Sequence, residues 1–331
     1  MSARAIPACL LLSGCMGTQS ALAPAGDQAR ALFSLLGLML WVAAAVYAVV
    51  IAGLGWALWR AWRRRGADAR GEAALLRGTD AALTRALPLT AGAIVLGLTV
   101  LITGSFFADR AVFATRAGPA LEVRVTGHQW WWRIQYRDPA GGGWIETANE
   151  LHLPQGQTVR LVLGAADVIH SFWVPNVAGK LDMIPGRTNR LDVTARRPGW
   201  YRGQCAEFCG TQHAHMAFDV RVESPAAFRA WLAAQVAPAA PSAGRGAAVF
   251  QATCAACHAI RGAGAAGRAG PDLTHVAARR SLAAGTLAMT RGNLQGWIAQ
   301  PQAIKPGTSM PQIPLTPADA DAVAAYLATL R

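Results

Sequence analysis

Six cysteines occur among the 331 residues, and four of them form two closely spaced pairs. Three residues separate Cys205 from Cys209, and two residues separate Cys254 from Cys257. In an oxidising compartment, the ordinary expectation for such a pair is a disulfide bond. The residues that follow each pair instead indicate sites where sulfur and nitrogen atoms bind a metal or a prosthetic group.

A histidine follows the second pair directly, so that residues 254–258 read CAACH. In this arrangement two thiols can form thioether bonds to the vinyl groups of a haem, and the next residue, His258, supplies an imidazole to the iron. A redox-active dithiol and a chance occurrence are the alternatives. The segment GPDL at 270–273 favours the haem interpretation.

The second axial ligand of such a haem has three candidates later in the chain, Met289, Met310 and His275. Met289 falls in a stretch with a helical pattern, whereas Met310 lies in PGTSMP (306–311), a rigid loop just before the last predicted helix. This part of the chain resembles class I cytochromes c, and the resemblance favours Met310. A methionine ligand raises the haem potential, which suits an electron donor.

The first pair opens a segment that holds two thiols, an imidazole and a thioether within twelve residues, from Cys205 to Met216. Another histidine, His170, lies upstream at the end of a predicted strand (167–172). Zinc is the ordinary metal for cysteine and histidine ligands, but the thioether favours copper. A mononuclear blue-copper site needs only one cysteine, so the second indicates two thiolates that bridge two coppers.

Two uncharged stretches, 31–59 and 86–108, are each longer than the roughly 20 apolar residues that cross a bilayer. They predict two transmembrane helices, and the alternative is a pair of buried helices in a large soluble protein. Between the stretches lie Arg60, Arg63, Arg64, Arg65 and Arg70. The positive-inside rule places this loop in the cytoplasm, and therefore both termini on the outer face.

The first residues resemble a bacterial lipoprotein signal, in which the chain is cut before a cysteine that is then lipidated. Residues 12–15 read LSGC, and Arg4 supplies the positive start of the segment. We therefore expect a signal peptide over 1–14, a lipidated Cys15 and an outer segment over 15–30. An unprocessed N-terminal tail is the alternative.

After residue 119 the pattern changes to short alternating segments that are broken by glycine and proline, which predicts a β-sandwich or barrel. The clearest predicted strands are 121–125, 158–163, 190–193 and 218–222. A helix from Pro225 to about Gln235 precedes a linker rich in alanine and proline. The remainder is predicted to be helical at 245–259 and 317–330.

The formal net charge of +13 would suggest a nucleic-acid partner if the chain were soluble. Much of this charge lies in the predicted cytoplasmic loop. From Gly244 onward, eight basic and three acidic residues leave a basic domain. A basic, haem-bearing domain on the outer side more plausibly faces an acidic protein surface, so no nucleic-acid partner is expected.

The segment 119–235 resembles subunit II of haem-copper cytochrome c oxidases, since residues 205–216 match the pattern CxExCxxxHxxM at every position. The resemblance implies a cupredoxin-like domain with a binuclear CuA centre, in which Cys205 and Cys209 bridge the coppers. The implied ligands are His170, Cys205, the backbone carbonyl of Glu207, Cys209, His213 and Met216. The Glu207 carboxylate would also help to hold magnesium at the boundary with subunit I, whereas His215 matches no ligand.

The aromatic run GHQWWW at 127–132 belongs to the same resemblance. In the family, the residue that matches Trp130 is where electrons reach the copper domain. Three tryptophans on a strand can also simply be core residues, and strand alternation would bury Trp130 and Trp132 on one face. Both interpretations can hold together.

The resemblance extends over nearly the whole chain and implies a multidomain architecture. It comprises a signal peptide (1–14), an outer segment (15–30), a transmembrane helix hairpin (31–108), an all-β cupredoxin-like domain (119–235), a linker (236–244) and an all-α class I cytochrome c domain (245–331). Such a chain is the electron-transfer subunit of a proton-translocating cytochrome c oxidase in the bacterial cytoplasmic membrane. Haem c would pass electrons through CuA to the oxygen-reducing site in subunit I.

No catalytic residue is expected on this chain, because the oxygen-reducing centre requires several histidines within the membrane and neither apolar stretch contains one. Subunits I and III and an upstream donor, such as a cytochrome or a bc1-type complex, are the expected partners. The family also places an acidic residue near the cytoplasmic start of the second helix, at the mouth of a proton path. Asp80 and Glu72 are the candidates.

Two rival functions remain. The chain could be the electron-accepting subunit of a related nitric oxide reductase complex, which uses similar parts. It could also be a copper-assembly protein, since such proteins use two cysteines at the same spacing with a distant histidine. An assembly protein would not need Met216, the paired histidines or a haem domain.

Overall fold

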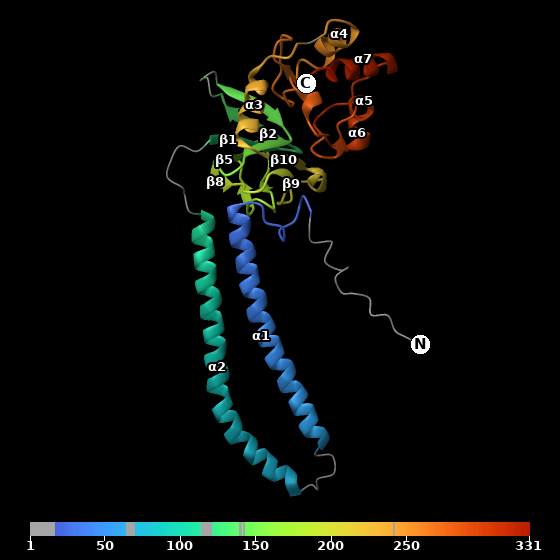
Figure 1. The fold of residues 1–331 in the computed structure, drawn as a ribbon. Helices are drawn as coiled ribbons and strands as arrows, with labels where there is room; N and C mark the ends of the chain where they lie inside the picture. Colours follow the sequence, from blue (N-terminus) through green and yellow to red (C-terminus); the bar gives the residue numbers. More distant parts are fainter. Residues whose placement is uncertain (1–16, 64–69, 114–120, 139–140, 142, 241) are drawn as a thin grey trace, which may run out of the picture. The chain divides into compact units, whose positions relative to one another are not determined.

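The computed structural model describes residues 17–63, 70–113, 121–138, 141, 143–240 and 242–331. The predicted signal peptide, Cys15, Arg64 and Arg65 lie outside the described residues. The chain separates into two compact units, one formed by residues 31–114 and the other by residues 1–30 together with 115–331 (Figure 1). Each unit is described by itself below.

The first unit consists of two long helices, α1 (Asp27–Arg63) and α2 (Arg70–Phe113). Both helices are longer than the predicted apolar stretches, because the polar residues on either side of each stretch are helical as well. The mean hydropathy is 2.5 for the span in α1 and 2.1 for the span Thr84–Arg110 in α2. Large apolar side chains such as Trp41 (75% exposed) and Leu89 (76%) point away from the unit. Such surfaces are stable in lipid rather than in water, so the helices fit a membrane anchor.

The two helices of this unit approach each other closely at Gly104. A Cβ atom at that position would lie 2.4 Å from Leu38 Cδ2, so only a glycine allows the present contact. Small residues are enriched where membrane helices pack together, because they leave room for the side chains of the partner helix.

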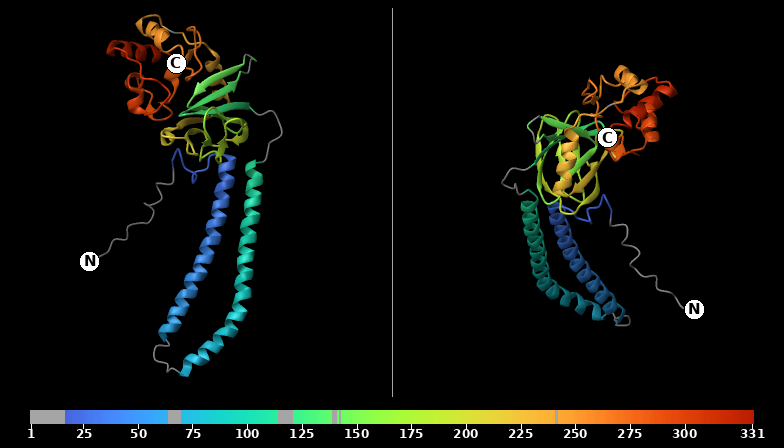
Figure 2. Two further views of the ribbon diagram at one scale, coloured as in Figure 1. Left: turned by 180° about the vertical axis from the view of Figure 1, so that it is seen from behind. Right: turned by 45° about the horizontal axis from the view of Figure 1, so that its top comes forward.

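A sandwich of two five-stranded sheets forms the first part of the second unit (Figure 2). One sheet has the order β3-β2-β1-β5-β8 and the other the order β4-β10-β9-β6-β7. The strands are β1 (Leu121–His128), β2 (Trp131–Arg137), β3 (Trp144–Ala148), β4 (Glu150–Pro154), β5 (Thr158–Ala165), β6 (His170–Trp173), β7 (Leu181–Met183), β8 (Asn189–Thr194), β9 (Gly199–Cys205) and β10 (Ala217–Glu223). The four segments predicted as strands lie in β1, β5, β8 and β10.

The core between the two sheets follows the alternation of the strands. In β5, Val159, Leu161 and Leu163 are buried, while the residues between them are only partly covered. Trp132 packs near Phe218, with ring centroids 5.0 Å apart. Helix α3 (Pro225–Val236) begins after Ser224, whose Oγ caps the helix, and buries its apolar face against the same core.

The segment before α1 is attached to the sandwich, although no structure was predicted for it. The Asn176 side chain donates to the carbonyls of Gly17 and Ala23, at 3.1 and 3.0 Å. At the start of α1, both carboxylate oxygens of Asp27 accept from the guanidinium of Arg196, at 2.7 and 2.6 Å. These contacts join residues more than 150 positions apart in the sequence.

The C-terminal part of the second unit is mainly helical, with a core around Phe250, Val323 and Tyr326. Its elements are α4 (Arg245–Thr253), β11 (Ala259–Ile260), β12 (Ala265–Ala266), η4 (Val276–Ala278), β13 (Ser281–Leu282), β14 (Leu287–Ala288), α5 (Arg291–Ala299), α6 (Pro301–Ile304) and α7 (Pro317–Leu327).

Two helix ends and one assignment in this part differ from the sequence prediction. Helix α4 ends at Thr253 rather than 259, because the chain leaves the helix at Cys254 and the CAACH motif forms a turn. Helix α7 ends at Leu327 instead of 330. The helical assignment of Met289 was wrong, since Met289 lies between β14 and Thr290, whose hydroxyl caps α5.

The close packing of Gly203 against the Phe218 ring gives a stability prediction. An added methyl at Gly203 would lie 2.0 Å from Phe218 Cζ. We therefore expect Gly203→Ala to lower the free energy of unfolding by about 1–3 kcal/mol, the usual cost of overpacking. Gly164→Ala is the matched control, because nothing lies within 4 Å of its added methyl. Denaturant unfolding of the full chain measures both, and equal losses would contradict the packing argument.

Candidate metal centres

Strand pairing brings the predicted metal ligands together from distant parts of the chain. Cys205 is the last residue of β9, and β6 pairs with β9 so that Phe172 faces Cys205. His170 was predicted to lie at the end of a strand, but it is the first residue of β6. The loop between β9 and β10 supplies the remaining donors, Cys209, His213 in the 3-10 helix η3 (His213–His215), and Met216.

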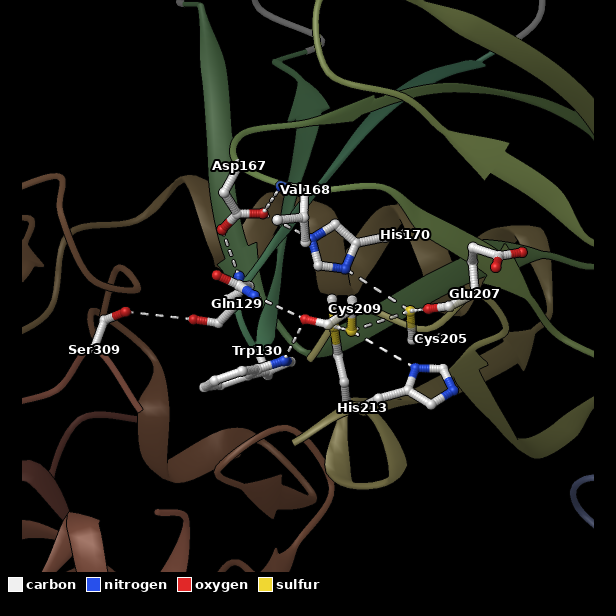
Figure 3. A network of polar contacts seen from close by, with 11 residues as sticks. Gln129, Trp130, Asp167, Val168, His170, Cys205, Glu207, Cys209, His213 and Ser309 are labelled. Carbon is white, nitrogen blue, oxygen red and sulfur yellow. Dashed lines mark hydrogen bonds and ion pairs between the residues drawn. The ribbon is translucent and has the colours of Figure 1, made fainter. Parts of the chain in front are cut away.

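Each thiol of this cluster has an imidazole of its own (Figure 3). Cys205 Sγ lies 3.8 Å from His170 Nδ1, and Cys209 Sγ lies 3.6 Å from His213 Nδ1. The two sulfur atoms are 3.7 Å apart, whereas a disulfide bond would bring them to about 2.05 Å. Met216 Sδ lies 3.7 Å from Cys209 Sγ. All the donors therefore surround the thiol pair, an arrangement that suits soft metal ions.

The thiol pair is already polarised before a metal binds. The hydrogen bond between the two thiols and, after it, the imidazole of His170 lower the pKa of Cys205 to about 3. The Cys205 thiolate in turn raises the pKa of Cys209. One thiolate is therefore present at neutral pH, and thiolate is the form that binds metals.

Asp167 orients His170, a role that the motifs in the sequence did not reveal. His170 Nε2 lies 2.8 Å from Asp167 Oδ1, so the other ring nitrogen is left to face Cys205. Asp167 also accepts from the backbone N–H groups of Gln129 and Val168, both at 2.7 Å. Carboxylates in this position fix the tautomer and the direction of a metal-binding imidazole. The only signal in the sequence is an acid three residues before the histidine.

Glu207 offers its backbone carbonyl to the cluster, since its oxygen lies 3.2 Å from Cys205 Sγ. Its carboxylate points away from the sulfur atoms and lies 3.7 Å from Lys180 Nζ (Figure 3). His215 is exposed, and its ring Nδ1 forms a hydrogen bond with Gln212 Oε1 at 3.0 Å. Its side chain lies apart from the thiol pair, in agreement with its omission from the predicted ligands.

Trp130 lies in the turn between β1 and β2, so the prediction of three tryptophans on one strand was wrong. The predicted burial holds, because Trp130 is 8% exposed and Trp132 is fully buried. Trp130 Nε1 donates to the carbonyl oxygen of Cys209 at 2.9 Å, and Gln129 Nε2 donates to the same oxygen at 2.8 Å. The indole is therefore bonded directly to the backbone of a predicted copper ligand.

The CAACH motif lines a cavity of about 220 Å³ in the C-terminal domain. Cys254, Cys257 and His258 lie on its wall, and Trp130 of the sandwich also lines it. His258 Nδ1 donates to the carbonyl of Pro271 at 2.7 Å, which leaves Nε2 as an electron pair donor. Burial lowers the pKa of His258 and keeps the imidazole neutral.

Gly270 is required beside this histidine. A Cβ atom at Gly270 would lie 2.6 Å from His258 Cε1, so a larger residue would displace the ring. The cavity, the paired thiols and the held imidazole together fit a covalently attached haem.

The three candidates for the sixth haem ligand lie in different surroundings. Met310 lines the cavity, and Gln302 holds its loop by donating to the Met310 carbonyl at 2.8 Å. His275 has both ring nitrogens near carbonyl oxygens, of Arg331 at 2.8 Å and of Ala237 at 3.1 Å. Met289 packs against the core of the domain. Of the three, only Met310 is among the described residues that line this cavity.

A cupredoxin-like sandwich with a sulfur-rich metal cluster, followed by a cytochrome c domain and preceded by two apolar helices, defines a membrane-anchored electron-transfer protein. Residues 139–223 match the family model of the cytochrome c oxidase subunit II periplasmic domain, and residues 243–331 match that of cytochrome c. Cytochrome c oxidase subunit 2 of Alkalihalophilus pseudofirmus is 34% identical over 97% of this chain and 94% of its own length. The chain belongs to the cytochrome c oxidase subunit II family, in a form with a fused cytochrome c domain.

Two further proteins of this kind are similar to parts of the chain. Cytochrome c oxidase subunit 2 of Bacillus sp. strain PS3 is 34% identical over 63% of this chain and 62% of its own length. The solved periplasmic domain of subunit II from Bradyrhizobium japonicum is 32% identical, covers 37% of this chain and 97% of its own, and superposes with a TM-score of 0.34. Membership of the family implies a CuA centre in the sandwich and haem c in the C-terminal domain, and the donor sets described above fit both groups.

Proposed function

We propose that this chain carries electrons from a donor outside the membrane, through its own haem, to a binuclear copper centre and on to the oxygen-reducing site in subunit I. The observation that supports this route most directly is the hydrogen bond from Trp130 Nε1 to the Cys209 carbonyl, at 2.9 Å. Trp130 lines the haem cavity and touches the backbone of a copper ligand at the same time. The same indole therefore lies beside both sites.

The residues that hold the two groups follow from the contacts. We assign the copper ligands as His170, Cys205, the Glu207 carbonyl, Cys209, His213 and Met216. We assign Cys254 and Cys257 as the thioether positions, His258 and Met310 as the axial ligands, and Trp130 as the point where electrons reach the copper domain. When bound, the copper pair and the haem each take up and release one electron. Hydrogen bonds hold the side chains of His170 and His258 in place, which would limit the rearrangement that accompanies each transfer.

The remaining assignments concern the complex and the membrane. The chain has no histidine before residue 128, so neither apolar helix can supply a histidine ligand to an oxygen-reducing centre. We place that centre in subunit I of a proton-translocating oxidase, with subunit III and a cytochrome or bc1-type donor as further partners. We also propose that Cys15 is lipidated after removal of residues 1–14, that Glu207 holds magnesium at the boundary with subunit I, and that Asp80 or Glu72 serves a proton path.

The orientation follows from the arginines of the loop between the helices. Arg60 and Arg63 end α1, and further arginines follow in the sequence. Positive residues stay on the cytoplasmic side, so both termini and both metal-binding domains would face the outside of the bacterial cytoplasmic membrane.

Metal analysis and electron paramagnetic resonance of the purified full chain test the proposal. We expect two coppers and one covalently bound haem per chain, with a seven-line mixed-valence copper signal. Zinc or a single copper, with the haem still present, would contradict the relay and favour a role in assembly or storage.

A further inference from the structure

Lys305 is a buried lysine at the start of the loop that carries Met310. Burial lowers its pKa to about 7, and three carbonyl acceptors around its Nζ favour the charged form. The chain contains only two lysines, and Lys305 is 2% exposed. None of the ion pairs among the described residues includes it. Its Nζ instead donates to three backbone carbonyls, of Trp130 at 2.8 Å, His215 at 2.9 Å and Ala283 at 3.0 Å.

These three acceptors come from both domains. Trp130 and His215 belong to the sandwich, where His215 directly precedes Met216, and Ala283 lies in the turn between β13 and β14 of the cytochrome domain. An ammonium group has three N–H donors and no acceptor, so the three carbonyls satisfy it completely. Hydrogen bonds from a charged donor are about twice as strong as neutral ones, and a buried cation without partners is costly. The ammonium therefore joins the two domains at a single buried point.

The rest of the loop contacts the sandwich around the same tryptophan. Gln212 Nε2 donates to the carbonyl of Pro306 at 2.8 Å. A Cβ atom at Gly307 would lie 3.6 Å from the Trp130 ring, so the loop backbone passes directly over the indole. Ser309 Oγ donates to the Gln129 carbonyl at 3.4 Å, a contact that is visible beside Trp130 (Figure 3). The loop of the proposed haem ligand therefore contacts Trp130 through Lys305 and Gly307, and contacts neighbouring residues of the sandwich through Pro306 and Ser309.

Other contacts between the two domains lie away from this loop. The Arg280 N–H donates to Glu150 Oε2 at 2.9 Å, and Ser281 Oγ donates to Asp219. They fix a different edge of the cytochrome domain and do not involve residues of the Met310 loop. The turn that carries Ala283 is also held to the sandwich, because the Ala217 N–H donates to the Ala284 carbonyl at 3.0 Å. Lys305 joins the Met310 loop to this turn and to Trp130.

We propose that Lys305 is the positioning residue for electron transfer within this chain, because its ammonium holds the Met310 loop against Trp130 and fixes the separation of the two centres. The proposal rests on the relay function proposed above and names the residue that sets its geometry. Electron transfer weakens steeply with separation, so a small outward movement of the loop slows it. Lys305 does not touch either proposed metal ligand set through its side chain.

Lys305→Met in the full-length chain within the membrane complex tests this role. Methionine has a similar unbranched shape but no N–H group, so the carbonyls of Trp130 and His215 lose the Lys305 bond, and the Ala283 carbonyl keeps only the bond from the Thr286 hydroxyl. After rapid reduction of the haem, we expect electron transfer to copper to slow on the order of tenfold or more, the scale of loss that small misplacements cause. Hydrogen exchange should also become faster in the peptides 129–132 and 302–310, including in the metal-free chain.

Arg291→Met is the matched control. It removes one positive charge from the same domain, but its guanidinium is 56% exposed and pairs with Asp321 of that domain at 2.7 Å. We expect wild-type electron transfer and wild-type exchange in this variant. If Arg291→Met slowed electron transfer as much as Lys305→Met does, the effect would be one of charge and the positioning role would be wrong.

The readouts separate this proposal from the relay itself. If the wild-type chain lacked the copper or haem signals, the relay would fail. If Lys305→Met kept both signals, transferred electrons at the wild-type rate and exchanged as the wild type does, only the positioning role would fail. Lys305→Gln retains two N–H donors and carries the test if the methionine variant does not fold. We expect its transfer rate to be intermediate, and a wild-type rate would overturn the proposal.

Discussion

We expect replacement of Cys209 with serine to abolish the mixed-valence copper signal and the electron transfer that depends on it. Cys209 Sγ lies 3.7 Å from Cys205 Sγ, 3.6 Å from His213 Nδ1 and 3.7 Å from Met216 Sδ, so it is the donor that connects the others. A serine hydroxyl stays protonated at neutral pH and is a harder ligand, so it cannot share electron density between two copper ions as a thiolate does. Electron paramagnetic resonance and copper analysis measure the loss.

His215→Asn is the control for this substitution. His215 lies in the same loop, its side chain is exposed, and its ring contacts Gln212 rather than a sulfur atom. We expect this variant to keep two coppers and the mixed-valence signal. Survival of the signal in Cys209→Ser would reject the assignment of Cys209 as a bridging ligand, and its loss in His215→Asn would show that the ligand histidine of this loop was assigned wrongly.

We expect replacement of Met310 with alanine to leave the haem covalently attached and to lower its reduction potential. The attachment depends on Cys254 and Cys257, which the substitution does not touch. A thioether ligand favours the reduced iron, so its removal stabilises the oxidised state. Axial ligands tune haem potentials over about 0.8 V, and we expect a fall of roughly a hundred millivolts or more. Potentiometric titration of the haem absorbance measures the change.

Met289→Ala provides the comparison with a methionine of the same domain. Met289 packs against the domain core and does not line the cavity, so its removal should reduce stability slightly and leave the potential unchanged. An unchanged potential in Met310→Ala would instead assign the sixth ligand to Met289 or His275. Because His275 has both ring nitrogens near carbonyl oxygens, it would have to give up one of these contacts to bind iron.

The chemistry of the two metal-binding domains could be predicted from the sequence because the ligands are local. Four of the side chains proposed to bind copper fall between 205 and 216, and three residues proposed to bind haem fall between 254 and 258. Such ligands are held on one loop or turn, so their spacing along the chain already reflects their spacing in space. The apolar helices could be predicted for the same reason, since the length of an uncharged stretch is a local property.

The tertiary structure decided which distant residues meet. The pairing of β6 with β9 brings His170 to Cys205 across 35 positions, and the β1–β2 turn brings Trp130 to the Cys209 carbonyl across 79. Asp167 can orient His170 only because the fold directs the imidazole Nε2 toward the Asp167 carboxylate. Among three possible sixth ligands, the loop packing puts Met310 on the cavity wall.

Lys305 is the clearest case of a residue whose contacts could not be predicted from the sequence. Its partners are backbone carbonyls, which every residue carries, so no pattern of side chains could reveal them. Local spacing therefore determined what this protein binds and that it is anchored by apolar helices. The packing of two domains determined how its centres are positioned, because long-range contacts depend on how complete surfaces fit together.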